Sequence, residues 1–140
     1  MVLQTALLRE NFASASKRGD HLYRLFYDTL FQRYPAFLLV FDDVDLDEQG
    51  PLLIEAVQTV LDNLDDEENL VEALIEFGRL HPSVAKLAMH NTPVGECFVD
   101  TLSVACFPAW DDRLAFAWKR AYEYASNLML SDRLALAAAY

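Results

Sequence analysis

Apolar side chains recur every three or four residues through most of this chain, a spacing that predicts amphipathic helices. The first instance places Leu3, Leu7, Leu8 and Phe12 on one side of a helix. Composition agrees, because Leu and Ala supply 41 of the 140 residues whereas Val, Ile and Thr together supply only 17. We therefore predict an all-α fold of about six or seven helices, in one domain that spans residues 1–140.

Proline, glycine and acidic residues interrupt this pattern and set the expected helix limits. Asp20 is a favourable N-cap for the second helix, which is expected to end before Pro35. Pro51 is acceptable in the first turn of a later helix, because a proline there loses no helical hydrogen bond. The expected segments are helices at 3–12 and 20–34, a short apolar piece at 36–41, and helices at about 48–64, 65–81, 93–107 and from 112 onward.

The charge of the chain limits its partners. It carries 22 acidic and 11 basic residues, for a net charge of −11. Phosphate contacts need clustered Lys and Arg, so neither nucleic acid nor an anionic membrane surface is an expected partner. No apolar run is long enough for a membrane span, and no signal peptide is recognisable at the start. With Cys97 and Cys106 expected as free thiols, these features predict a cytoplasmic protein.

An acidic stretch at 42–47 invites comparison with a calcium-binding loop. Asp43, Asp45 and Asp47 alternate like the first three ligands of an EF-hand. That loop also needs Gly at its sixth position and Glu at its twelfth, where this chain has Glu48 and Ile54. We therefore interpret the stretch as a solvated acidic loop.

His81 is the strongest candidate ligand among the three histidines. It ends an amphipathic helix, so its ring can project beside Phe77 and Leu80. Gln49 lies at the start of another helix, with Leu53 one turn further on. Two antiparallel helices of this kind, one with an imidazole and one with an amide above apolar side chains, would form a slot for a flat cofactor.

Several segments together resemble a known family. Residues 25–35 (LFYDTLFQRYP) resemble its second helix and the following proline, and residues 78–81 (GRLH) resemble the segment that ends in its proximal histidine. Residues 94–96 (VGE), which follow His90, resemble the start of its next helix, and residues 117–122 resemble its last helix. The family is that of the bacterial single-domain globins, which are related to flavohaemoglobins. The resemblance covers about residues 5–130.

The resemblance implies a set of site residues around haem b, bound without a covalent link because no Cys-x-x-Cys-His motif is present. His81 would ligate the iron, and the unliganded ferrous iron would be five-coordinate. Tyr27 and Gln49 would donate hydrogen bonds to bound O₂. Leu53 would close the pocket over the gas. The remaining haem contacts implied are Phe41, Phe77 and Val94, with Lys86 either pairing a propionate or simply solvated.

Two functions lead at this point, ahead of a haem sensor coupled to a partner and a haem-free globin-like interaction domain. The first is reversible binding of O₂, CO and NO, as in oxygen transport, with no catalytic residue. The second is a nitric oxide dioxygenase or peroxidase that is reduced by a separate reductase, in a monomer or a homodimer. The chain departs from flavohaemoglobins at Pro82, which follows the proximal histidine, and at Asn91 and near Arg133, where a supporting tyrosine and glutamate are expected. These departures weaken the support for a strongly basic proximal ligand.

Overall fold

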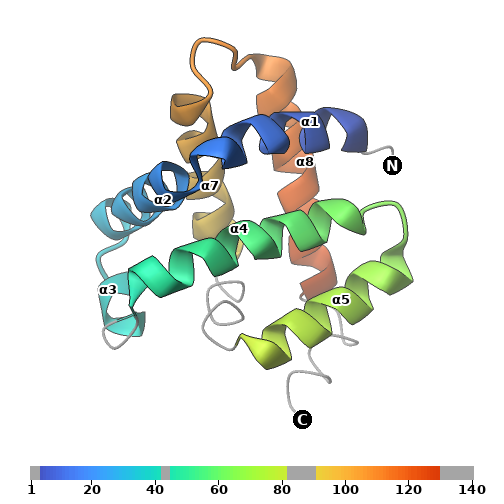
Figure 1. Cartoon of the computed structure of the whole chain (residues 1–140), viewed down its shortest axis with the longest axis horizontal. Helices are drawn as coiled ribbons and strands as arrows, with labels where there is room; N and C mark the ends of the chain where they lie inside the picture. The colour runs from blue at the N-terminus through green and yellow to red at the C-terminus, as the bar shows by residue number, and fades with distance from the viewer. Residues whose placement is uncertain (1–3, 42–44, 82–90, 130–140) are drawn as a thin grey trace.

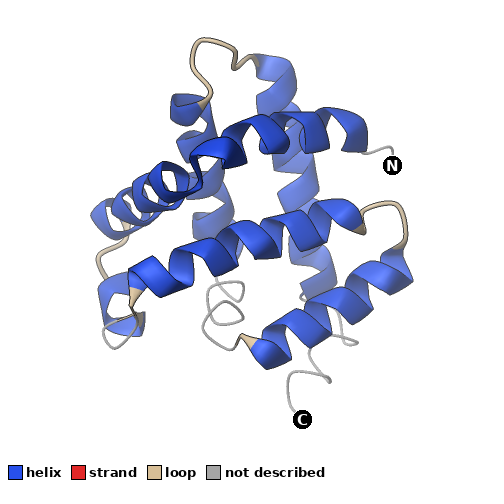
Figure 2. Cartoon of the chain, in the orientation of Figure 1, coloured by secondary structure: helices blue, strands red, loops and turns tan. Residues whose placement is uncertain are grey.

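A computed structural model describes residues 4–41, 45–81 and 91–129 of the chain (Figure 1). The described residues contain helices and loops, without a strand, which confirms the predicted all-α fold (Figure 2). The elements are α1 (Thr5–Ala15), η1 (Ser16–Arg18), α2 (Gly19–Arg33), α3 (Phe37–Val40), α4 (Leu46–Asp62), α5 (Glu67–Leu80), α7 (Asn91–Ala105) and α8 (Asp112–Met129). None of the described helices is both long enough and apolar enough to cross a membrane.

The helices pack in two groups. One contains α1, α2, α7 and α8, the other contains α4 and α5, and the two groups meet chiefly where α2 packs against α4. α2 packs against both α7 and α4, α7 packs against α8, and α1 packs against α8 and α4. In Figure 1, α4 and α5 run in opposite directions, side by side. The end of α5 therefore returns toward the first half of α4, as the antiparallel pair expected from the sequence requires.

Four aromatic rings from four helices form the centre of the core. Phe12 of α1, Phe26 of α2, Phe98 of α7 and Trp118 of α8 lie with ring centroids 5.7–6.4 Å apart. Most of these pairs are edge-to-face, the arrangement that aromatic quadrupoles favour. The Trp118 indole Nε1–H also donates to Asn11 Oδ1 at 2.9 Å, which joins α8 to α1.

α4 begins earlier than the sequence analysis placed it. Asp45 is its N-cap and accepts a hydrogen bond from the Asp47 N–H at 2.9 Å, so the helix starts at Leu46 and not near Glu48. Part of the acidic stretch is thus a helix N-terminus, where carboxylates are favourable, and the interpretation of the whole stretch as a loop is wrong. The explanation offered for Pro51 is also wrong, because Pro51 is the sixth helical residue and lies beyond the first turn. The helix ends at Asp62, slightly before the expected limit.

The junction between the first two long helices also differs from expectation. The predicted break at 19–20, with Asp20 as an N-cap, is replaced by the short 3₁₀ turn η1, which leads from α1 directly into α2 at Gly19. The short apolar piece at 36–41 contains the one-turn helix α3. α7 starts at Asn91, so Pro93 falls in its first turn, as a proline should.

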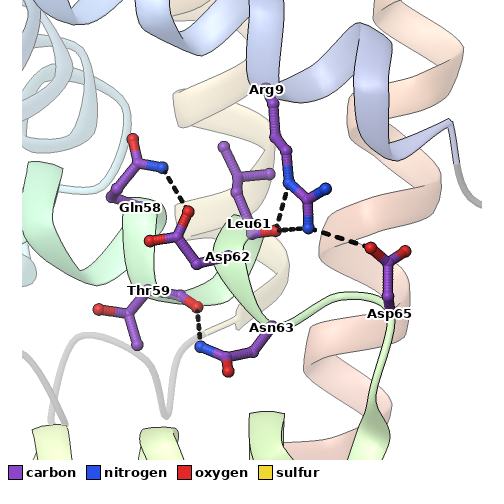
Figure 3. Close-up of polar contacts among 7 residues, drawn as sticks. All are labelled: Arg9, Gln58, Thr59, Leu61, Asp62, Asn63 and Asp65. Atoms are coloured by element: carbon purple, nitrogen blue, oxygen red, sulfur yellow. Dashed lines mark hydrogen bonds and ion pairs between the residues drawn. The ribbon is translucent and has the colours of Figure 1, made fainter.

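A side chain from α1 fixes the end of α4. The Arg9 guanidinium donates from Nε and Nη2 to the Leu61 carbonyl oxygen at 2.9 and 2.7 Å, and from Nη2 to Asp65 at 3.2 Å (Figure 3). The last carbonyls of an α-helix have no partner within the helix, so Arg9 satisfies one of them. Asn63 Nδ2 donates to the Thr59 carbonyl of the same last turn at 2.8 Å.

Candidate functional site

Tyr27 lies in the middle of α2 and is held by aromatic neighbours. Only 2% of its surface is exposed. Its ring stacks on Phe31 at 5.8 Å and meets the edge of Phe41, just after α3, at 6.0 Å. Phe41 is itself buried. These contacts fix the orientation of the phenol before any ligand is present.

Gln49 is the fourth residue of α4 and is buried, with 4% of its surface exposed. A glutamine amide is seldom buried without partners, because removing it from water without a hydrogen bond is unfavourable. Leu53, one turn further along α4, is also buried. The sequence indicated a helix start for Gln49, whereas the structure places it fourth in α4 and buried.

Two buried polar atoms at this site have no hydrogen-bond partner among the described residues: Tyr27 Oη and Gln49 Nε2. An unsatisfied buried polar group costs about 1–3 kcal/mol, so two such groups on neighbouring helices require an explanation. Burial raises the pKa of Tyr27 well above its ordinary range, and the nearby Gln49 amide only partly offsets this rise. No hydrogen bond of acceptable geometry joins the two side chains, however. Tyr27 is therefore a neutral O–H donor with nothing to donate to.

His81 closes α5 from the C-cap position. Its backbone N–H donates to the Phe77 carbonyl at 2.9 Å, and its ring lies 4.7 Å from the Phe77 ring. The predicted neighbour Phe77 is thus confirmed. Leu80, the last residue of α5, is 62% exposed. His81 is half-buried and lies at the C-terminal end of α5.

The structure describes only some of the other predicted site residues. Val94, in the first turn of α7, is half-buried and packs against the core. Lys86, Pro82, His90 and Arg133 lie outside the described residues. Both cysteines are free thiols, as predicted, and burial raises the pKa of the Cys97 thiol.

A contact beside the two unpartnered donors was not predicted from the sequence. Tyr23, one turn before Tyr27 on α2, is buried, and its ring lies against the backbone of α4 at Gly50. A glycine inside a predicted helix is a sign of close backbone approach. The glycine alone does not indicate which helix packs against it.

Comparison with known proteins relates the chain to a protein family and to a curated relative. The family model described as Globin matches residues 24–129, which include every described candidate residue. A curated relative, the Flavohemoprotein of Bacillus subtilis (strain 168), is 23% identical over 118 residues, or 83% of this chain. The match covers 30% of that relative, so the chain spans less than a third of its length. Since the family model covers most of the chain and the helices have the expected order, this protein belongs to the globin family, whose members bind haem.

Proposed function

We propose that this globin binds haem b without a covalent link and reversibly binds O₂, CO and NO. The observation that carries the proposal is the pair of buried, unpartnered donors, Tyr27 Oη and Gln49 Nε2. A polar ligand between α2 and α4 would satisfy both. Haem would supply an iron whose sixth coordination position accepts a diatomic gas.

His81 is the proposed iron ligand on the proximal side. A neutral imidazole is the usual proximal ligand of globins, and the tilted contact with Phe77 limits rotation of the ring. Phe41, Phe77 and Val94 supply apolar surface for a flat macrocycle. The proposal that Lys86 pairs with a haem propionate rests on the sequence alone.

On the distal side, Tyr27 and Gln49 are the proposed donors to the bound gas. Bound O₂ carries partial negative charge on its outer atom, and a donor in a dry site stabilises that charge. The raised pKa of Tyr27 keeps its hydroxyl protonated, so that it can donate. Buried Leu53 helps to exclude water from the same space.

The proposal is tested by haem content and absorption spectra of the purified protein. We expect one haem b per chain, five-coordinate ferrous iron, and distinct O₂ and CO spectra. His81→Ala should lose haem or change the ferrous spectrum, whereas His21→Ala, at an exposed histidine on α2, should change neither. Normal haem content and an unchanged ferrous spectrum in His81→Ala would rule out this ligand.

A second candidate function is nitric oxide dioxygenase or peroxidase activity, with electrons from a separate reductase. Similarity to a flavohemoprotein favours it. The same donors would then hold the reacting gas. Steady-state NO consumption in air with a chemical reductant present tests it, since a dioxygenase should form nitrate over many turnovers, whereas a globin that only binds O₂ should form it in a single turnover. The cytoplasmic location and the separate reductase are part of this proposal and rest on the sequence.

A further inference from the structure

The contact between Tyr23 and Gly50 is unusually close. A Cβ placed on Gly50 would lie 2.2, 2.3 and 2.4 Å from Cδ1, Cγ and Cε1 of the Tyr23 ring. Carbon atoms in contact normally lie about 3.5–4.0 Å apart, so no side chain fits between them. Cγ joins the ring to the rest of Tyr23, so the ring cannot clear this space without a change of rotamer or a shift of α2. The ring therefore rests directly on the backbone of α4.

This contact lies next to both unpartnered donors. Tyr23 and Tyr27 are one helical turn apart and so share a face of α2. Gly50 follows Gln49 directly, and both residues are buried. A change in the spacing of α2 and α4 at Gly50 would therefore also move Tyr27 and Gln49 relative to each other.

The lack of a bond between these donors needs a physical reason. If α2 and α4 lay closer, the hydroxyl and the amide could pair with each other and would no longer be available to a ligand. If the helices moved apart, one donor would lose reach of a ligand held by the other. A rigid ring on a bare backbone sets one distance, because neither surface can compress or rearrange easily.

We infer that Tyr23 and Gly50 are positioning residues, which hold Tyr27 and Gln49 apart and available for one shared ligand. The inference rests on the proposed function, because the ligand is the gas bound to haem. Tyr23 and Gly50 act through the two donors and do not touch the ligand themselves.

The test compares two glycine substitutions at similar helix contacts. A Cβ on Gly95 of α7 would lie 2.6–2.9 Å from the Tyr122 ring of α8, a pair of helices that carries neither donor. Gly50→Ala and Gly95→Ala should therefore both destabilise the protein. Only Gly50→Ala should shift the C–O stretching band of the CO complex, because that band responds to nearby hydrogen-bond donors. It should also speed O₂ release by roughly 2- to 10-fold, the effect of weakening one hydrogen bond.

Substitutions of the two rings complete the design. Tyr23→Phe keeps every ring carbon of the contact and should leave the C–O band and the O₂ release rate unchanged. Tyr23→Leu removes the flat ring and should shift the band even if Gly50→Ala does not fold. Tyr122→Leu, at the contact with Gly95, should leave the C–O band unchanged.

The outcomes distinguish failure of the proposed function from failure of the positioning role. If the unsubstituted protein binds no haem or CO, the proposed function fails, and the inference fails with it. If it binds CO normally but Gly50→Ala and Tyr23→Leu keep its band while losing stability like their Gly95 and Tyr122 counterparts, the contact is structural only. The positioning role would then be overturned, while the proposed function would stand.

Discussion

At the scale of single residues, Tyr27 and Gln49 are both buried donors but differ in freedom. The Tyr27 ring is held between Phe31 and Phe41, and its hydroxyl needs only one rotation to aim. The Gln49 side chain has three rotatable bonds, so aiming its amide costs more conformational entropy. Burial of Gln49 reduces that cost. The difference still favours Tyr27 as the stronger donor.

We predict that Tyr27→Phe speeds O₂ release roughly 10- to 100-fold, equivalent to a loss of about 1.4–2.8 kcal/mol. Gln49→Leu should have a smaller effect. CO carries less charge when bound and should respond weakly to both substitutions. Stopped-flow release rates for O₂ and CO measure all of these effects. A larger acceleration in Gln49→Leu would reverse the ranking.

The buried phenol also predicts how stability depends on pH. Burial raises the pKa of Tyr27 in the folded protein, whereas an unfolded tyrosine titrates near pH 10. Above about pH 10 the unfolded chain loses this proton and the folded protein keeps it, so the free energy of unfolding falls as pH rises. Below that pH the contribution is constant. Urea unfolding between pH 9 and 11 should show a shallower decline for Tyr27→Phe, and equal slopes would contradict the assignment.

At the scale of helices, the sequence predicts which segments are helical better than where they begin. The apolar spacing located every described long helix, because each one buries a stripe against its neighbours. The start of α4 was misplaced, although Asp45 followed by Glu48 is a recognisable N-cap signal. The contact of Tyr23 with Gly50 could not be predicted in this way, since it depends on the crossing of two helices.

The hydrogen bonds from Arg9 to the end of α4 lead to a prediction about helix anchoring. Arg9→Ala should lower the free energy of unfolding by about 1–2 kcal/mol, because charged hydrogen bonds to a part-buried carbonyl are lost. Arg79→Ala is a matched control, since Arg79 pairs with Glu76 on the exposed surface of α5 and should contribute less than about 0.5 kcal/mol. Urea denaturation of both variants decides the comparison. Equal losses would show that the Arg9 contact adds no more than a surface ion pair.

At the scale of the whole molecule, the two helix groups differ in how extensively their helices are packed. α1, α2, α7 and α8 share the aromatic centre of the core. α5 packs chiefly on α4, and only Leu70 and Val71 of that helix are buried. The candidate residues on α4 and α5 were predicted from the family resemblance. It could not predict the unequal packing, which depends on how the helices meet.

Removal of haem should therefore affect α5 most. A ligand that binds only the folded state stabilises whatever it contacts, and α5 has few other buried contacts. We expect hydrogen–deuterium exchange to speed up strongly in α5 after haem extraction, and much less in α2 and α7. A uniform increase across all helices would contradict this unequal packing.

The bond between Trp118 and Asn11 has a consequence for synthesis of the chain. The two residues are 107 positions apart, and Phe12 of α1 meets the same indole ring. At about 5–20 residues per second, a ribosome needs roughly 5–20 s to make the residues between them. Throughout that interval α1 lacks its partner on α8, and the part of its apolar stripe that packs there is uncovered. This part of α1 must therefore stay free of aggregation until α8 has emerged.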